Sequence, residues 1–265
     1  MSTNTAQSSS VEAVQRVGGD VVFLDLRLNS GIKPRPGQFV MAYTKGSEEI
    51  PLSIMDYEKG ILRLGVKSVG HSSKLFVQLK CGDYVSIRGP YGTHFQTHNA
   101  TNLLLTSYGL GLIPLYFLAK ERKKKGLETH GLCLLKENDI VLSKLLEPHV
   151  SSVRVIRGDT EEMSYYEEIR NILVDKGFDL VVSCGYKTFV YRVWRACEDA
   201  EVPAQLSLER MMKCGMGLCG SCLIDGERGS IRLCTDGPVL SSETLRDLSD
   251  FGSFEYNDTG RKVKI

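Results

Sequence analysis

The chain lacks several features that would narrow its function at once. Its 33 Lys and Arg residues are balanced by 32 Asp and Glu, so the formal net charge is +1 and no overall field favours nucleic acid. The longest apolar run, residues 103–118, is broken by Gly and Pro and is shorter than the ~20 residues that a membrane helix needs. The five histidines are scattered and form no ligand-spaced cluster. We therefore expect no membrane span and no nucleic-acid partner.

The first ten residues lack the apolar core of a signal peptide. They are polar and rich in Ser and Thr, which predicts a frayed tail. The missing signal favours a cytoplasmic location, where cysteines stay reduced and available to metal. With 265 residues, the chain is long enough for about two domains.

Half of the eight cysteines fall in one glycine-rich window, with gaps of four, two and eleven residues. These four are Cys214, Cys219, Cys222 and Cys234. The spacing matches the plant-type [2Fe–2S] pattern. The glycines at 215, 217 and 220 allow positive φ angles, which turn backbone N–H groups toward the sulfurs. The window therefore predicts a [2Fe–2S] cluster.

Other uses of the four cysteines remain open at this point. A Cys-x-x-Cys pair is also half of a common zinc site, although zinc ribbons usually have two such pairs and this window has one. A redox dithiol or structural disulfides are further alternatives. The remaining cysteines stand alone and are expected to be small buried hydrophobic residues. They are Cys81, Cys133, Cys184 and Cys197.

The N-terminal part shows the alternation of short strands separated by turn residues. Leu62, Leu64 and Val66 alternate with polar or small residues, which indicates a strand with one buried face. Five or six such strands predict a small antiparallel barrel. The predicted strands cover residues 21–28, 38–43, 50–55, 61–69 and 84–88.

Two segments of this predicted barrel are candidates for cofactor contacts. One is Pro51-Leu52-Ser53 at the start of a strand. The other is Gly70-His71-Ser72-Ser73, which leads into a short helix and offers N–H groups to a phosphate. The alternative for Ser72 or Ser73 is a helix N-cap.

From residue 102 the pattern changes to alternating strands and helices, which predicts a doubly wound parallel sheet. Ligands of such sheets bind at the carboxyl ends of the strands. Here that edge carries Ser107-Tyr108-Gly109 and Cys184-Gly185-Tyr186. The basic run at residues 122–125 is interpreted as a solvated helix end. Strands are predicted at 103–105, 131–135, 153–156, 180–184 and 205–208, and helices at 112–125, 141–146, 165–176 and 188–198.

Over roughly residues 12–240, the chain resembles the iron–sulfur flavoprotein electron-transfer subunits of dihydroorotate dehydrogenase, which belong to the ferredoxin-reductase superfamily. The motifs that carry the resemblance are the cysteine window, Pro36-Gly37-Gln38-Phe39-Val40, Pro51-Leu52-Ser53-Ile54, Gly89-Pro90-Tyr91-Gly92 with Phe95, Ser207-Leu208-Glu209-Arg210-Met211 and Asp236-Gly237-Pro238-Val239. The expected fold is α+β and multi-domain: an FAD-binding antiparallel β-barrel (11–98), an α/β doubly wound parallel sheet (99–204), a [2Fe–2S] cluster lobe (205–245) and a C-terminal tail (246–265).

The resemblance also implies roles for individual residues. The four window cysteines are implied as cluster ligands. Pro51, Leu52 and Ser53 would lie along the flavin and ribityl chain. Gly65, Val66 and Lys67 would pass its nucleotide portion. Gly70, Ser72 and Ser73 would form the pyrophosphate turn.

Several positions depart from the family's pattern. Ile50 stands where the family has an Arg beside the FAD phosphates, so Lys67, Lys74 or His71 would have to compensate. Tyr108 falls in a turn that is usually three glycines, and Tyr186 replaces a proline. Because Tyr108 would crowd a pyridine nucleotide, NAD use stays uncertain and weak or absent NADH oxidation is predicted.

The resemblance implies an oxidoreductase subunit of pyrimidine biosynthesis. Dihydroorotate would be oxidised on an FMN-containing catalytic subunit, in a heterotetramer, and electrons would pass through the cluster to FAD and on to NAD or another acceptor. No catalytic acid or base is nominated in this chain. Met216 and Leu218 are the expected partner contacts. Alternatives are a ferredoxin- or hydrogenase-linked NAD(P)H reductase subunit and a non-enzymatic redox sensor or zinc-stabilised binding module.

Overall fold

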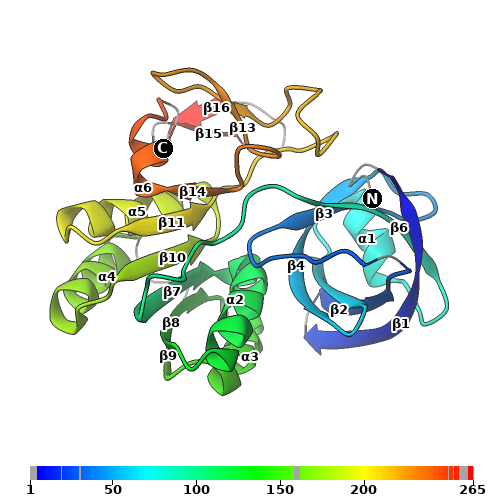
Figure 1. The fold of residues 1–265 in the computed structure, drawn as a ribbon, viewed down its shortest axis with the longest axis horizontal. Helices are drawn as coiled ribbons and strands as arrows, with labels where there is room; N and C mark the ends of the chain where they lie inside the picture. Colours follow the sequence, from blue (N-terminus) through cyan, green and yellow to red (C-terminus); the bar gives the residue numbers. More distant parts are fainter. Residues whose placement is uncertain are drawn as a thin grey trace.

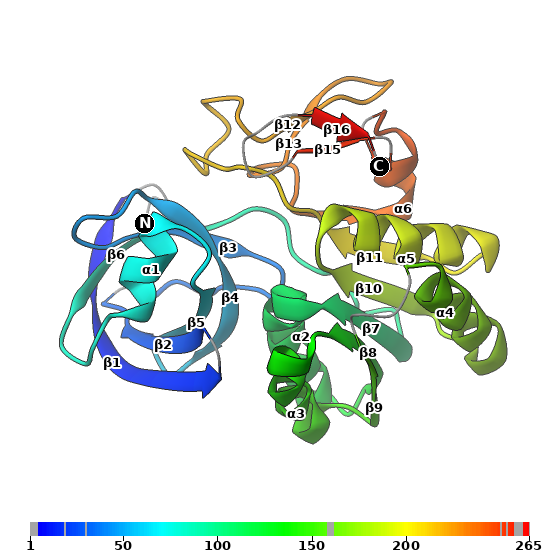
Figure 2. The same ribbon diagram turned by 180° about the vertical axis from the view of Figure 1, so that it is seen from behind.

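The protein is seen here as a computed structural model that describes residues 5–18, 20–29, 31–157, 162–249, 251–252, 254–256 and 262–264. A β-barrel and an α/β sheet domain lie side by side, and a C-terminal lobe lies above them (Figures 1 and 2). No helix in this described part of the chain is long and apolar enough to cross a membrane.

The barrel is closed and antiparallel, with strand order β1-β2-β5-β4-β3-β6. The predicted alternation is confirmed in β5, where Leu62, Leu64 and Val66 are buried. The elements are β1 (Gln7–Gly18), β2 (Val21–Arg27), β3 (Phe39–Tyr43), β4 (Ile50–Glu58), β5 (Ile61–Lys67), helix α1 (His71–Val77) and β6 (Tyr84–Tyr91).

The prediction of a frayed tail up to residue 10 is wrong for its last four residues. Gln7 to Ser10 belong to β1 and pair with Ile87 to Tyr84 of β6. Backbone hydrogen bonds to a neighbouring strand do not require apolar side chains, so a polar segment can close the barrel. Ser9 is fully buried there.

The sheet domain has strand order β14-β11-β10-β7-β8-β9, parallel except for the edge strand β14. Helices α2 and α3 cover one face, and α4 and α5 cover the other (Figure 1). The strands are β7 (Asn102–Tyr108), β8 (Glu128–Leu135), β9 (Ser152–Arg157), β10 (Leu180–Cys184), β11 (Ala204–Ser207) and β14 (Val239–Ser241). The helices are η1 (Gly109–Gly111), α2 (Leu112–Lys124), η2 (Glu137–Leu142), α3 (Ser143–Leu146), η3 (Glu147–His149), α4 (Glu162–Lys176) and α5 (Lys187–Asp199).

Apolar side chains on both faces of this sheet explain why its strands read as continuous hydrophobic runs. Leu103 and Leu105 pack in one core with α2, while Leu104 between them packs in the core under α4 and α5. Phe23 of β2 and Met55 of β4 join the α2 core from the barrel. The barrel and the sheet domain therefore share one apolar interface, which fixes the walls of the cavity between them.

Arg122 is not part of a solvated helix end, as its basic run had suggested. Its side chain is 2% exposed. The guanidinium donates to Thr129 Oγ1 at 2.8 Å and to the carbonyls of Ala100 at 3.0 Å and Glu128 at 2.8 Å. Charge-assisted bonds to carbonyls satisfy a buried cation without a carboxylate. The prediction failed because the partners are backbone groups from other segments.

The prediction that the lone cysteines are buried holds for three of the four. Cys133, Cys184 and Cys197 are buried, as predicted, but Cys81 is exposed. Cys81 lies in the turn before β6, where the chain reverses at the surface.

The C-terminal lobe contains β12 (Leu223–Ile224), β13 (Ile231–Arg232), α6 (Ser242–Arg246), β15 (Phe254–Tyr256) and β16 (Lys262–Lys264). Its core continues that of α5. Phe251, in the predicted tail, is 7% exposed and packs edge-on against Tyr191 and Trp194 of α5. This part of the tail is therefore docked on the sheet domain.

Candidate cofactor sites

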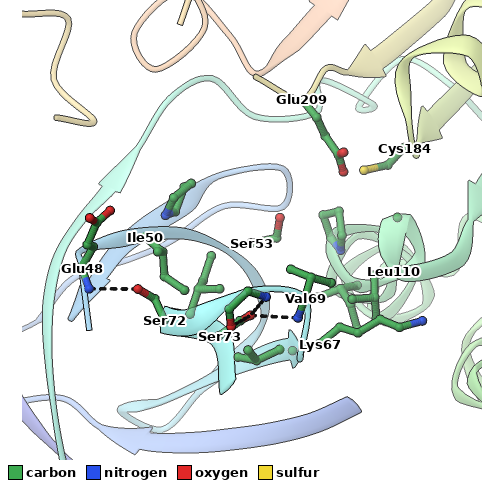
Figure 3. A pocket seen from close by; sticks show the side chains of 18 of the residues that line it. Glu48, Ile50, Ser53, Lys67, Val69, Ser72, Ser73, Leu110, Cys184 and Glu209 are labelled. Carbon is green, nitrogen blue, oxygen red and sulfur yellow. Dashed lines mark hydrogen bonds between the residues drawn. The ribbon is translucent and has the colours of Figure 1, made fainter. Parts of the chain in front are cut away.

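A cavity of about 720 Å³ lies between the barrel and the sheet domain. Its barrel wall comes from β4, β5 and α1, and its opposite wall from the start of α2 with Cys184 and Glu209 (Figure 3). All nine predicted cofactor-contact residues line it. They are Pro51, Leu52, Ser53, Gly65, Val66, Lys67, Gly70, Ser72 and Ser73. The volume is in the range of small-molecule and cofactor pockets.

Small residues of β4 and β5 line the middle of the cavity. Ser53 of β4 is exposed and faces the interior (Figure 3). At Gly65 of β5, an added Cβ would lie 2.7 Å from Ile113 of α2, so the strand and the helix approach closely there. A flat ring system would therefore find space beside Ser53 on β4, whereas the Ile113 side chain covers β5 at Gly65.

The turn before α1 is organised by its two serines, but neither is the N-cap. Gly70 is the N-cap residue. Ser73 Oγ accepts hydrogen bonds from the backbone N–H groups of Val69 and Gly70, each at 2.9 Å, and donates to Gly70 O at 3.1 Å. Ser72 Oγ accepts from Glu48 N at 2.9 Å (Figure 3), which leaves its own hydrogen available to a ligand.

Lys67 has a different partner from the one expected of a phosphate-binding lysine. Its ammonium Nζ lies 3.0 Å from Asp139 Oδ2 in η2, an ion pair that links β5 to the sheet domain. His71 lines the cavity, whereas Ile50 supplies no charge. Phosphate oxygens at this turn would thus meet mainly N–H and hydroxyl donors.

Cys184 and Glu209 complete the far wall; Cys184 was expected at the ligand-binding edge of the sheet, whereas Glu209 was not predicted as a cavity residue. Both point toward the interior opposite Ser53 (Figure 3). The Glu209 side chain is exposed to the cavity, yet desolvation by the surrounding protein raises its pKa. Glu209 lies in a segment that the sequence did single out, but its placement beside Cys184 requires the fold.

The cysteine window forms a loop with the predicted glycine geometry. Gly215, Gly217 and Gly220 have φ angles of +73°, +81° and +73°. The Gly217 N–H donates to Cys234 Sγ, with an N–S distance of 3.1 Å. Such N–H···S contacts stabilise a thiolate and help to set the potential of a cluster.

The four cysteines lie in two pairs. Cys222 and Cys234 are 3.3 Å apart between sulfurs. Hydrogen bonds from Ser221 and then Cys214 lower the pKa of Cys219 to about 6. Within the described residues, no three ligand side chains already surround one point. The donor set itself, four thiols on one loop with N–H donors between them, fits an iron–sulfur cluster.

One arginine of the barrel holds the cysteine loop in place. Arg88 Nη2 donates to the carbonyl of Cys214 at 3.0 Å, and Arg88 Nη1 donates to Tyr91 Oη at 3.0 Å. The same guanidinium forms a bidentate ion pair with Glu49, with Nε 2.7 Å from Oε1. Glu49 directly precedes the β4 segment that lines the cavity. The candidate cluster loop and the candidate flavin wall are therefore joined by one side chain.

The carboxyl edge of the sheet carries two tyrosines. Tyr108 ends β7, and Tyr186 follows Cys184 and Gly185 at the end of β10. Their rings meet edge to face, with centroids 4.4 Å apart and an interplanar angle of 87°. Tyr108 thus packs against Tyr186 at the edge where the sequence predicted that it would crowd a pyridine nucleotide.

A closed antiparallel barrel beside a doubly wound sheet, with a cavity between them, defines a ferredoxin-reductase-like fold, here extended by a four-cysteine loop. One similar solved structure is a chain of an NADH-dependent reduced ferredoxin-NADP oxidoreductase, with TM-score 0.80, 23% identity and coverage of 91% of this chain and 89% of that one. Another is the ferredoxin reductase in carbazole 1,9a-dioxygenase, with TM-score 0.65, 18% identity and coverage of 75% and 66%.

The sequence comparisons are more specific. Residues 8–96 match the oxidoreductase FAD-binding domain, and residues 209–246 match the iron-sulfur cluster binding domain of dihydroorotate dehydrogenase B. A probable dihydroorotate dehydrogenase B (NAD(+)), electron transfer subunit from Pyrococcus furiosus is 35% identical over 89% of this chain and 90% of that protein. The relative of the same name from Methanothermobacter thermautotrophicus is 31% identical over 86% of each. The chain belongs to this family of electron transfer subunits.

Proposed function

We propose that this chain is the electron-transfer subunit of a dihydroorotate dehydrogenase in pyrimidine biosynthesis, with a [2Fe–2S] cluster and FAD placed between an FMN-containing catalytic subunit and a terminal acceptor. The observation that carries the proposal is the Arg88 link, because one guanidinium bonds both the Cys214 carbonyl and Glu49, which directly precedes the cavity-lining part of β4. When bound, FAD exchanges electrons singly or in pairs, and an iron–sulfur cluster exchanges them singly.

On this proposal, the chain's residues hold and orient the two groups. Cys214, Cys219, Cys222 and Cys234 ligate the cluster, and the Gly217 N–H is an additional donor to Cys234. The flavin rests against Pro51, Leu52 and Ser53 and along Gly65, Val66 and Lys67. Its pyrophosphate lies at the turn of Gly70, Ser72 and Ser73, where the Ser72 hydroxyl donates. The corresponding division is the predicted one, an FAD barrel (11–98), a nucleotide-binding-like domain (99–204), a cluster lobe (205–245) and a tail (246–265), except that β1 extends the barrel back to Gln7 and that β11 and β14 complete the sheet of the second domain.

The partner surface is proposed at the cysteine loop. Leu218, between two of the cysteines, is 80% exposed, and Met216 is half-buried beside it. An apolar residue so exposed on a cluster loop suits a protein partner. The catalytic FMN subunit in a heterotetramer is the proposed occupant, and oxidation of dihydroorotate takes place there rather than in this chain. A cytoplasmic location goes with this assignment.

The direct test is anaerobic reconstitution of the FAD- and iron-loaded protein with the catalytic subunit. Addition of dihydroorotate should bleach the flavin absorption of this chain, and it should not do so when the catalytic subunit is omitted. A reconstituted complex in which dihydroorotate bleaches the FMN of the catalytic subunit but not the FAD of this chain would refute the proposal. Flavin and cluster absorption in the purified protein separate it from a zinc-stabilised module, which would be colourless.

A further inference from the structure

The carboxyl edge of the sheet is where this fold class binds a dinucleotide. β7 lies between β8 and β10, and the chain leaves β7 toward β8 but returns later to β10 on the other side. That reversal of direction is a topological switch point, and ligands bind in the crevice outside it. Ser107 and Cys184 face each other across the two strands at this point. The cavity reaches the crevice through Leu110, Gly111 and Cys184.

The crevice is filled by aromatic rings. Besides the contact between Tyr108 and Tyr186, the ring of Phe189 lies 5.9 Å from that of Tyr108 and 6.2 Å from that of Tyr186. Tyr165 of α4 backs Phe189 at 5.4 Å. Edge-to-face and tilted contacts at these distances are the favoured packing of aromatic side chains. The two tyrosines are therefore held from behind and do not project loosely into solvent.

The backbone is closely packed beside the rings at Gly111 and Gly185. A Cβ added at Gly185 would lie 2.9 Å from the Tyr108 Cβ, and one added at Gly111 would lie 2.0 Å from the Cys184 carbonyl oxygen. A pyridine nucleotide at this edge needs the main chain to be free of side chains, which is why glycines serve there. The residues present do not fit NAD or NADP.

We infer that the Tyr108–Tyr186 pair closes the nicotinamide position, so that the terminal acceptor of this chain is not a pyridine nucleotide. The inference rests on the proposed function and narrows the choice of its acceptor. Oxidation of one dihydroorotate to orotate releases two electrons and two protons. Both electrons pass from FAD to an acceptor other than a pyridine nucleotide, singly or as a pair. No hydride is transferred to nicotinamide C4.

The test adds NADH, and separately NADPH, to the isolated FAD-loaded chain without the catalytic subunit under anaerobic conditions, and follows flavin bleaching. The wild type should bleach slowly. The double variant Tyr108→Gly with Tyr186→Pro, which opens the crevice, should bleach on the order of 100-fold faster at the same NADH concentration. Tyr84→Gly, which removes an exposed tyrosine from the barrel, is the matched control and should behave like wild type.

Wild-type bleaching within tenfold of the double variant would overturn the inference. If the double variant does not retain FAD, titration of the wild type with NADH decides the question. Binding weaker than about 1 mM supports closure, and a Kd below about 0.1 mM contradicts it. Since these measurements omit the catalytic subunit and dihydroorotate, their failure is distinguishable from failure of the reconstitution test.

Discussion

The barrel wall of the central cavity and the carboxyl edge of the neighbouring sheet carry different kinds of side chain. On the barrel wall, Ser53 leaves the surface open where a flavin would rest, whereas Ile113 of α2 covers Gly65. The sheet edge carries Tyr108 and Tyr186, which pack on each other at the strand ends. The comparison teaches that one fold can retain one cofactor site and fill the neighbouring one, because side chains at strand ends change without disturbing the sheet beneath them.

The largest expected effect concerns the cysteine loop, which Arg88 holds against the barrel. Cys222→Ser should remove nearly all bound iron, because the Cys222 sulfur is buried beside Cys234 and serine is a poor ligand for iron–sulfur clusters. Iron analysis and visible absorption of anaerobically purified protein measure the effect. Cys81→Ser, at an exposed cysteine outside the loop, is the control and should retain full iron. Equal iron in both variants would contradict the ligand assignment.

The next prediction places on the barrel wall a ring like the one that Tyr108 places at the sheet edge. Ser53→Tyr places a ring in the open part of the cavity and should weaken FAD binding on the order of 100-fold, or ~2.7 kcal/mol. Ser53→Ala, which keeps the space, should change the affinity far less. Flavin fluorescence during titration of the flavin-free protein reports both values. If the tyrosine variant binds FAD like wild type, the flavin does not rest on β4.

A smaller effect is expected from the link between the two sites. Arg88→Gln leaves Glu49 without its cation and the Cys214 carbonyl without its donor, and the Arg88 side chain is 14% exposed. The loss should be about 2 kcal/mol of unfolding free energy, measured by denaturant titration. Arg27→Gln breaks an ion pair with Glu12 in which the two side chains are 46% and 39% exposed, and should lose less than about 1 kcal/mol. Equal losses in the two variants would show that the Arg88 interactions stabilise the fold no more than an exposed ion pair does.

The smallest expected effect is a pH dependence of the stability, caused by Glu209 in the cavity wall opposite Ser53. Because desolvation by the protein around the cavity raises the pKa of Glu209, the folded protein binds this proton more tightly than the unfolded chain does. Ionisation of Glu209 therefore opposes folding, and stability declines as the pH rises through its raised pKa. Glu209→Gln should raise Tm at pH 7 and leave it nearly unchanged at pH 3.5.

The matched control for this pH profile is Glu227→Gln, at an exposed position of the C-terminal lobe. It should shift Tm equally little at both pH values. A Glu209→Gln variant with the same Tm as wild type across the whole range would show that the carboxyl is as well solvated when folded as when unfolded.

Much of the fold was readable from local patterns. The alternation of Leu62, Leu64 and Val66 predicted β5, and the hydrophobic run at 180–184 predicted a buried parallel strand. The cysteine spacing predicted one loop, and the glycines at 215, 217 and 220 predicted its backbone. These signals depend on neighbours in the sequence, so the sequence alone was sufficient.

What could not be predicted depends on partners distant in the sequence. Glu209 and Cys184 meet at the cavity only because β10 and β11 are neighbours. Arg88 reaches a carbonyl that lies 126 residues later. Lys67 looked free for phosphate, but its partner Asp139 belongs to another domain. Sequence patterns therefore predict least about the contacts of polar residues whose partners lie far away in the chain.

The buried guanidinium of Arg122 has a consequence for proteolysis. Its carbonyl partners at Thr97 and Ala100 lie in the segment that leads from the barrel to β7. A protease must draw an extended stretch of chain into its active site, and exposed loop tips with unbonded backbone yield most easily. Because the carbonyls of Thr97 and Ala100 accept hydrogen bonds from Arg122, this segment cannot easily be drawn into a protease active site. Limited digestion of the folded protein should therefore spare the junction at 97–101, although domain junctions are usually the first bonds to be cut.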